Sequence, residues 1–450
     1  AVADHVVGWW YAPAALAGRA TATALVYAGM AILCLAWLAL GRDPMPSRRS
    51  LISIAALWVL PLALAPPLFS RDVYSYVAQG TIMHLGHSPY DTAPSALAAL
   101  GRPHVLAAVS PFWAGTTAPY GPLFLGLVSL VVAAVGSHLV AAVLLTRLTG
   151  IAGLTLLAIY VPRLARAVGS DARPALWLVA LSPLTTLELI APVHNDLLMA
   201  GVLAAALACA LDGHPLAGVA LCALAATIKL PALAGAAFIA VAWARAEPDA
   251  GARVRLLALS ALSALAVLAA VTLITGAGVG WLSSSVFSTP AKVRLAITPA
   301  TAVGYTAAWA LGHLGVAVSA RGLEGAIGLV AAAVTAALGL ALLWRVRIST
   351  LVASLGGFLA IAAAGGPAAW PWYLAWSLAL VCVLRGVQRS RVVALAIIAS
   401  AFVVKPDGIL LLSRGAAPIV LLVYVAGAAW WWRTRDRPPS AERASIPVGA

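Results

Sequence analysis

The chain has 450 residues, of which 63% are hydrophobic and only 9% are charged. A soluble domain carries about 25% charged residues, so this composition excludes a globule covered by water and predicts a protein solvated by a lipid bilayer. The formal net charge of +14 does not indicate nucleic-acid binding. Most arginines lie in short connections between apolar runs, as in the cytoplasmic loops of membrane proteins.

The predicted elements begin with two apolar helices and a long outer segment. A bilayer-spanning helix needs about 20 apolar residues, so the runs near 21–41 and 50–69 are predicted to cross, followed by an extracytoplasmic loop over about 70–137. Within this loop Pro122–Val135 is predicted to form a surface helix. A crossing there would place Arg163 and Arg166 outside, against the positive-inside rule.

The remaining crossings complete an all-α polytopic membrane protein with about 13 transmembrane helices. They are predicted near 138–162, 174–192, 196–211, 214–230, 232–246, 254–275, 323–345, 351–368, 371–386, 391–404 and 417–433. A second extracytoplasmic loop covers about 276–322. Arg147 falls inside a crossing and is predicted to face protein rather than lipid. Residues 1–433 form one predicted transmembrane domain, and 434–450 a disordered cytoplasmic tail.

This topology brings many polar residues to the outer face of the membrane. They are Arg71, Asp72, Asp91, His194, Asn195, Asp196, Lys229, Lys292, Arg294, Lys405, Asp407 and Arg414. Ionisable groups at membrane depth are costly, so a cluster of them at one level indicates a water-accessible cavity.

A polar and aromatic run, Arg71–Gly80, follows the second predicted crossing. If it continues as a helix, Asp72, Ser75, Tyr76 and Gln79 lie on one face. A carboxylate beside hydroxyl and amide groups can accept a proton from a sugar hydroxyl. The alternative is that Asp72 only caps the helix that follows it.

The run His194-Asn195-Asp196 lies at an outer turn between two predicted crossings. It is consistent with a capped turn, in which Asn195 or Asp196 is the N-cap of the next helix. A capped helix N-terminus also favours a nearby anion, so structural and binding roles are compatible.

Three cations are candidates for binding a lipid phosphate. Lys229 ends an apolar helix just before Pro231, where it either extends its amine to the membrane interface or contacts the phosphate. Lys292 and Arg294 lie in the second outer loop and either clamp the same phosphate or belong to a solvated loop.

A last aromatic run, Trp370-Pro371-Trp372-Tyr373, forms another outer turn. Such residues belong either to the aromatic belt of a membrane protein or to a surface that stacks on a sugar, for which Trp113 and Tyr120 are further candidates.

Taken in order, these motifs resemble those of actinobacterial polyprenol-phosphomannose-dependent α-1,6-mannosyltransferases, which have the GT-C fold. The resemblance rests on the following segments: Ser70–Gly80, Pro119–Leu123, His194–Asp196, Ile228–Pro231 and Pro371–Leu374. It implies a GT-C architecture whose long first outer loop carries a surface helix. It also implies transfer of mannose from polyprenyl-phosphate mannose to a growing mannan of lipomannan and lipoarabinomannan, at the outer face of the plasma membrane.

The resemblance implies that the catalytic aspartate is Asp72, and one departure from the family pattern argues against a metal. Many GT-C enzymes have two adjacent acids there, whereas here Arg71 precedes a single aspartate. The four cysteines fall inside apolar helices without metal-ligand spacing. Neither a metal nor another cofactor is therefore expected, since the lipid-linked sugar is a substrate.

A β-linked donor and an α-linked product require inversion, hence one displacement and one general base, for which Asp72 is the candidate. The phosphate leaving group needs charge neutralisation, assigned to Lys229, Arg294, His194 and Lys292. The remaining residues are assigned to the sugar and acceptor: Arg71, Tyr74, Tyr76, Gln79, Tyr120, Asn195, Asp196, Trp372 and Tyr373. Two alternatives remain, a GT-C transferase for another lipid-linked sugar such as arabinofuranose, and a lipid or sugar transporter.

Overall fold

The computed structural model describes residues 18–136, 138–282, 298–316, 319–366, 368–406, 408 and 414–434. The first helices are α3 (Arg19–Leu40), α4 (Arg48–Leu64), α5 (Asp72–His84), η2 (Pro94–Leu97), α6 (Pro103–Ala108), α7 (Pro111–Ala114), α8 (Pro122–Val135) and α9 (Leu139–Ala167). The middle of the chain forms α10 (Ala172–Ala180), α11 (Pro183–Thr185), η3 (Thr186–Ile190), α12 (Asp196–Leu211), α13 (Pro215–Ala226), η4 (Leu230–Ala232), α14 (Leu233–Ala246), α15 (Ala250–Thr275) and η5 (Gly280–Leu282). The last helices are α17 (Pro299–His313), α18 (Ala320–Arg345), η6 (Ile348–Thr350), α19 (Leu351–Gly365), η7 (Pro371–Tyr373), α20 (Leu374–Val381), α21 (Arg385–Gln388), α22 (Arg391–Val403), η8 (Arg414–Ala416) and α23 (Ala417–Thr434).

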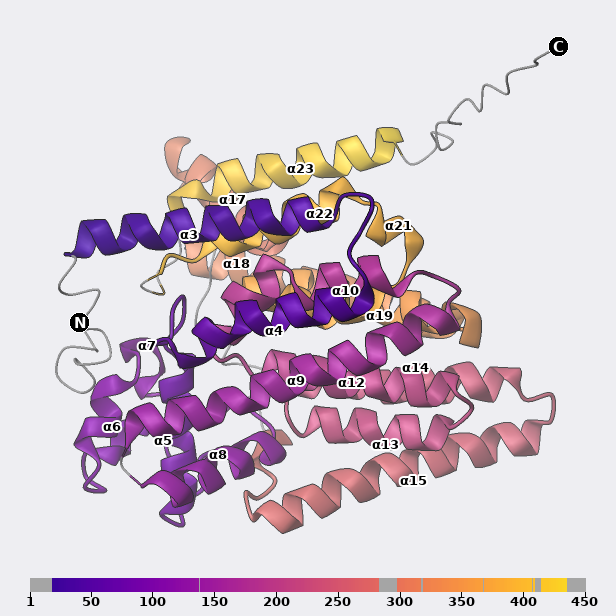
Figure 1. Ribbon diagram of the computed structural model, residues 1–450, viewed down its shortest axis with the longest axis horizontal. Coiled ribbons are helices and arrows are strands. Elements are labelled where there is room, and N and C mark those ends of the chain that lie inside the picture. The colour runs from indigo at the N-terminus through magenta and orange to yellow at the C-terminus, as the bar shows by residue number, and fades with distance from the viewer. Residues whose placement is uncertain are drawn as a thin grey trace.

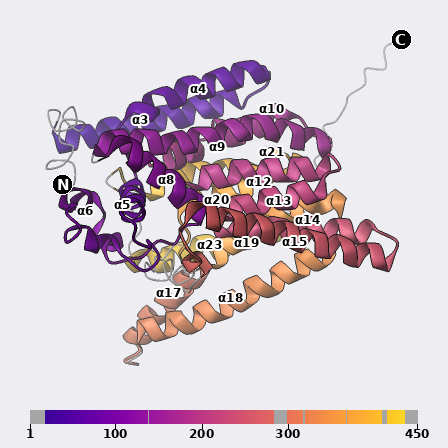
Figure 2. The ribbon, with the colours of Figure 1, turned by 90° about the horizontal axis from the view of Figure 1, so that it is seen from below.

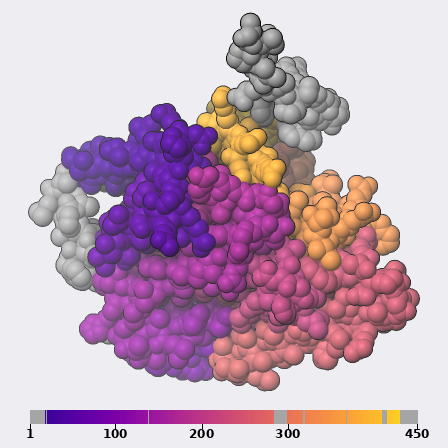
Figure 3. Space-filling model, turned by 45° about the vertical axis from the view of Figure 1, so that its right-hand side comes forward, coloured from indigo at the N-terminus to yellow at the C-terminus, as the bar shows by residue number. Residues whose placement is uncertain are grey.

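The long helices run side by side as a bundle, with a group of short helices at one end. In Figure 1, α3, α4, α9 and α23 extend in nearly the same direction, and α5 and α6 gather at one end of them. Figure 2 shows the same grouping from another side. On the face drawn in Figure 3, the N-terminal helices lie directly against the middle of the chain. The cluster of buried apolar residues includes members from both regions.

The predicted all-α protein is confirmed for the described residues, which contain helices but no strand. Five helices are long and apolar enough to cross a membrane: Ala20–Leu40, Leu139–Ala167, Ala250–Thr275, Ala320–Arg345 and Ile348–Gly365. On α15 and α18 large apolar side chains such as Leu273 and Leu329 are exposed, as expected where a helix contacts lipid. Each predicted crossing contains helix, but most of the others are shorter, so the number of crossings stays a prediction.

Two segments differ from the sequence prediction. The range predicted as one crossing near 174–192 is broken, because α10 ends at Ala180 and Ser182 caps the short α11 before a π-helical turn, η3. In the second predicted loop, the helix α17 begins at a capping box formed by Thr298 and Thr301. It packs against α18 and α23, so part of that loop is helical.

The predicted surface helix is present as α8, with the predicted bounds Pro122–Val135. It packs closely on α5, because a Cβ at Gly80 would lie 2.7 Å from the Val128 side chain. The sequence prediction that α8 lies along the surface rather than crossing stays a prediction.

The helices α9 and α12 cross closely and position the centre of the bundle. A Cβ at Gly153 would lie 2.3 Å from the Leu197 carbonyl oxygen, and one at Gly201 would lie 2.5 Å from the Gly153 carbonyl oxygen. Small residues at such crossings let the backbones approach, as is common between membrane helices.

Arg147 on α9 faces protein, as predicted, with 1% of its surface exposed. Its guanidinium donates hydrogen bonds of 2.7 and 2.8 Å to the carbonyl oxygens of Ala63 and Ala65, and one of 3.2 Å to that of Ala191. The first two carbonyls end α4 and the third precedes α12. Arg147 therefore joins two segments that are far apart in the sequence.

Candidate functional site

A cavity of about 310 Å³ lies beside the N-terminus of α5 and collects residues from five parts of the chain. Its lining comes from α5, the segment before α8, the turn before α14, the end of α19, and η7 with α20: Asp72, Ser75, Tyr76, Gln79, Trp113, Thr116, Pro119, Tyr120, Lys229, Leu230, Pro231, Ala362, Ala363, Gly366, Ala368, Trp370, Trp372, Tyr373 and Trp376. The four residues predicted to share one face of α5 all line it. Its volume lies within the range of about 300–1,000 Å³ typical of ligand pockets.

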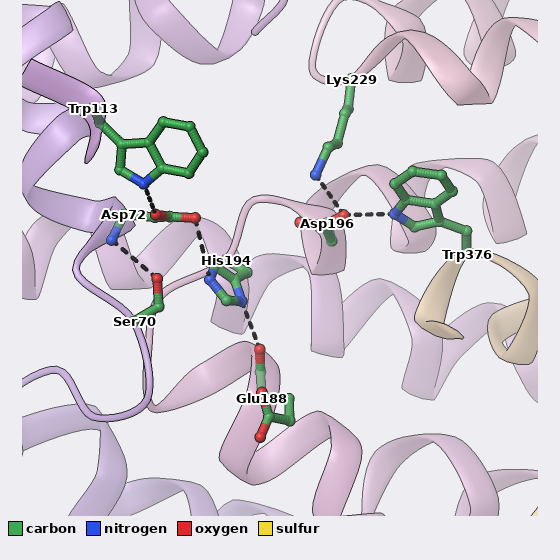
Figure 4. Close-up of polar contacts among 8 residues, drawn as sticks. All are labelled: Ser70, Asp72, Trp113, Glu188, His194, Asp196, Lys229 and Trp376. Carbon is green, nitrogen blue, oxygen red and sulfur yellow. Dashed lines mark hydrogen bonds and ion pairs between the residues drawn. The ribbon is translucent and has the colours of Figure 1, made fainter. Parts of the chain in front are cut away.

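Asp72 begins α5 and points toward the cavity, with its carboxylate held on both sides (Figure 4). The indole nitrogen of Trp113 donates to Oδ1 at 3.0 Å, and Oδ2 lies 3.6 Å from Nε2 of His194. The backbone N–H of Asp72 donates to the Ser70 hydroxyl at 3.1 Å. The carboxylate thus contacts side chains of the site, which goes beyond the capping role that the sequence left open.

Lys229 and Asp196 form an ion pair at the opposite side of the cavity (Figure 4). The ammonium lies 2.7 Å from Oδ1 of Asp196, which also accepts a 2.5 Å hydrogen bond from the Trp376 indole. Lys229 also lies over the rings of Tyr373 and Trp376, at 4.8 and 5.4 Å from their centroids. The ammonium is therefore held by protein groups beside the cavity and does not project freely from the surface.

The turn that carries His194-Asn195-Asp196 is not closed by a side-chain cap. Asn195 is the N-cap of α12, but its side chain makes no capping hydrogen bond. It is fully buried, and neither of its side-chain polar atoms has a hydrogen-bond partner among the described residues. The predicted N-cap position is therefore confirmed for Asn195, but its side chain does not make the capping hydrogen bond.

Gly121 brings two of the sequence motifs into contact. The N–H of Gly121 donates to the Ile228 carbonyl at 3.1 Å, and that of Leu123 donates to the Thr227 carbonyl at 2.9 Å. A Cβ at Gly121 would lie 2.2 Å from the Thr227 carbonyl oxygen. Only glycine permits this approach, which places Tyr120 and Lys229 on the same cavity.

Aromatic rings form much of the cavity wall. Tyr76 and Tyr120 meet edge to face at 4.9 Å, and Trp370 stacks on Trp372 at 4.7 Å. Burial raises the pKa of Tyr120 far above its ordinary value, and the nearby Asp72 carboxylate raises it further. The Tyr120 phenol therefore remains neutral and can donate a hydrogen bond to a ligand.

The structure brings together many, but not all, of the predicted site residues. Those that line the cavity are Asp72, Tyr76, Gln79, Tyr120, Lys229, Trp372 and Tyr373. His194, Asn195 and Asp196 are buried behind the wall. Tyr74 is buried outside it, and Arg71 donates to the carbonyls of Ala108 and Val109 at 2.8 Å each. Arg71 thus holds the end of α6. Neither Arg71 nor Tyr74 lines the cavity, so the predicted contact of these two residues with a sugar has no support in their placement.

Some predicted or overlooked residues remain to be placed. Lys292 and Arg294, with Asp407, lie outside the described residues. Trp376 was not singled out by sequence reasoning, although it follows Trp372 and Tyr373 of η7 by four and three residues, a spacing that places α20 side chains beside them. Trp113 was considered only for stacking, and its hydrogen bond to Asp72 has no signal in the sequence.

The described residues contain no group of three histidine, cysteine, aspartate or glutamate side chains that could hold a metal ion. The expectation that no metal takes part stays a prediction.

Comparison with known proteins gives one consistent result. The family profile described as "Alpha-(1->6)-mannopyranosyltransferase, N-terminal domain" matches residues 1–245. The chain is 34% identical over 406 residues to alpha-(1->6)-mannopyranosyltransferase A of Mycobacterium tuberculosis, covering 87% of this chain and 77% of that one. A probable alpha-(1->6)-mannopyranosyltransferase of Mycolicibacterium smegmatis is 42% identical over 41% of this chain and 34% of its own. The Corynebacterium glutamicum alpha-(1->6)-mannopyranosyltransferase A is 35% identical over 34% of this chain and 30% of its own. No solved structure matches the chain.

Proposed function

This chain belongs to the alpha-(1->6)-mannopyranosyltransferase family, and we propose that it transfers mannose from polyprenyl-phosphate mannose to a growing mannan glycolipid. The transfer takes place within a GT-C architecture at the outer face of the plasma membrane. One observation carries the proposal: a carboxylate, Asp72, and an ammonium, Lys229, line the same cavity between aromatic walls.

Asp72 is the general base of the proposed reaction. It takes the proton from the 6-hydroxyl of the acceptor while that oxygen bonds to C1 of mannose. The C1–O bond to the phosphate breaks in the same displacement, so the configuration inverts and polyprenyl phosphate leaves. The Trp113 N–H, 3.0 Å from Oδ1, fixes the carboxylate and leaves Oδ2 directed toward the reacting hydroxyl and His194.

Lys229 faces the donor phosphate in this proposal. An ammonium has three N–H donors, and one is used by Asp196 at 2.7 Å, which leaves the others for the cavity. The charges of Asp72 and Asp196 outweigh the single charge of Lys229, however, so a phosphate needs further positive charge. We assign this to Lys292 and Arg294, as the sequence predicted, by charge-assisted bonds.

The aromatic wall recognises the sugars. The faces of Trp372 and Tyr373 already pack on Trp370, His194, Trp376 and Lys229, so their edges supply apolar surface to the cavity. The neutral phenols of Tyr76 and Tyr120 offer hydrogen bonds. The narrow set of polar groups in a largely apolar cavity suits a sugar carried by a lipid, because one end of the substrate is apolar.

A donor panel tests the proposal. Membranes containing the chain are incubated with a mannan acceptor and, separately, with polyprenyl-phosphate mannose, polyprenyl-phosphate arabinofuranose or a nucleotide-linked mannose. We expect α-1,6-linked product with the first donor only, with no loss on adding a chelator. Product from the arabinofuranose donor, or movement of lipid-linked sugar across the membrane without product, would overturn the assignment.

Asp72→Asn is the matched variant, because asparagine keeps the size and the acceptor oxygen for Trp113 but not the basicity. We expect transfer to fall by about 10²–10⁴-fold, the range that general-base catalysis supplies. Turnover close to that of the wild type would remove Asp72 from the base role.

A further inference from the structure

His194 occupies a position that the phosphate-binding role does not explain. Its side chain is fully buried and lies between the Asp72 carboxylate and the backbone of η3. Nδ1 is 2.7 Å from the backbone carbonyl oxygen of Glu188, as Figure 4 shows. Because a carbonyl only accepts hydrogen bonds, Nδ1 must carry the hydrogen, and the tautomer of the ring is fixed.

The other ring nitrogen is therefore the one that can gain or lose a proton. Nε2 lies 3.6 Å from Oδ2 of Asp72 and has no hydrogen-bond partner among the described residues. In the neutral ring, two electron-rich atoms face each other across this gap. In the protonated ring, an N–H⁺ group faces a carboxylate.

A third contact lies against the face of the His194 ring. The His194 and Trp372 ring centroids are 3.9 Å apart, with an interplanar angle of 41°. The face of an indole attracts a cation. The carbonyl fixes the ring orientation, and the carboxylate and the indole face are placed to attract the ring once Nε2 has accepted a proton.

We propose that His194 is the proton acceptor that completes the transfer reaction, acting through Asp72; this inference rests on the proposed function. The proton of the acceptor hydroxyl passes to Oδ2 of Asp72 and from there to Nε2 of His194. Asp72 returns to the carboxylate, and His194 becomes an imidazolium until it releases the proton to water. The 3.6 Å gap closes in the complex, since catalytic hydrogen bonds are often long before substrate binds.

The local backbone holds the ring in place for this step. Val193, just before His194, adopts φ +66°, which is strained for a β-branched residue, and η3 is a π-helical turn. Both features are uncommon and are found preferentially at functional sites. They aim the Glu188 carbonyl, rather than its carboxylate, at Nδ1 (Figure 4).

The titratable and charged groups on the elements around His194 are few. They include Asp72, Tyr74, Tyr76 and His84 on α5, Arg147 on α9, Glu188 on η3, Asp196 on α12, Lys229 before η4 and Tyr373 on η7. Asp196 and Lys229 are paired with each other, and the Glu188 carboxylate has no partner among the described residues. Asp72 is therefore the group that exchanges a proton with the ring.

His194→Asn tests the proposal, because the Asn amide can still donate to the Glu188 carbonyl but cannot accept a proton. Transfer is measured across pH at saturating and limiting donor. We expect kcat to fall by about 10²-fold with the donor KM changed less than about twofold. The pH profile of kcat should also change in shape, because one of the two groups that take up the proton is absent in the variant.

His87→Asn is the control, since His87 is exposed in the outer loop and should keep the wild-type profile. His194→Gln, compared by thermal unfolding, separates loss of activity from loss of folding. A lower kcat with a pH profile of unchanged shape would reduce His194 to a structural role. A raised donor KM with an unchanged kcat would instead support the role first predicted for His194, binding of the donor phosphate. Either result leaves the donor panel and Asp72→Asn intact, so it is distinct from failure of the proposed function.

Discussion

Replacing Gly121 with alanine should disrupt the site without removing any functional group. The new Cβ would lie 2.2 Å from the Thr227 carbonyl oxygen and 2.3 Å from its carbonyl carbon, so the two segments must separate by about 1 Å to reach ordinary contact. The bonds from Gly121 N to Ile228 O and from Leu123 N to Thr227 O are lost or stretched. At about 1 kcal/mol each, we expect a loss of about 2 kcal/mol in stability.

The larger effect is on catalysis, because Lys229 lies two residues beyond Thr227. A displacement of about 1 Å at a reacting group can cost about 10²-fold in rate. We expect kcat/KM for the lipid-linked donor to fall by that order, and thermal unfolding to shift only modestly. Gly115→Ala is the control, since a Cβ there meets nothing within 4 Å. Wild-type activity in Gly121→Ala, or an equal loss in both variants, would refute the reasoning.

Two further predictions concern the supports of the site. Trp113→Phe removes the hydrogen bond to Asp72 and keeps an aromatic ring. A hydrogen bond to a charged group contributes about 1.5–3 kcal/mol. We therefore expect about a tenfold or greater loss of kcat in the transfer assay, with the unfolding temperature unchanged. Arg147→Met leaves the buried Ala191 carbonyl oxygen and the part-buried carbonyl oxygens of Ala63 and Ala65 without this donor, and a buried acceptor left unpaired costs about 1–3 kcal/mol. We expect a clearly lowered unfolding temperature, and an unchanged one would contradict the joining role of Arg147.

The sequence predicted the face of α5 but not the partners of Asp72. The spacing of Ser75, Tyr76 and Gln79 from Asp72 is a local property of one helix, so periodicity alone placed all four on the cavity. Trp113 is 41 residues from Asp72 in the sequence. His194 precedes α12, in a different part of the bundle from α5. No local pattern encodes such pairs, because they depend on how the helices pack.

The pairing of Lys229 with Asp196 could be foreseen only in part. Both residues were placed at the outer face, where the cost of a buried charge favours a partner of opposite sign. The sequence did not indicate which of the nearby acids would pair with the ammonium. Lys229 pairs with Asp196 because α12 begins at Asp196 and so places its carboxylate beside the ammonium. The Trp376 indole donates to the same carboxylate oxygen and holds it there.

Two backbone features indicate that the site is formed before any substrate binds. Phe69 and Val193 have φ values of +64° and +66°, and each lies three residues before an aspartate of the site. Strained residues of this kind cost about 1–3 kcal/mol and persist only where surrounding contacts over-determine them. Arg147 supplies such contacts to both segments, through the carbonyls of Ala65 and Ala191. One buried guanidinium thus ties together the two segments that lead to Asp72 and Asp196, and Trp113 and Trp376 then hold the carboxylates themselves.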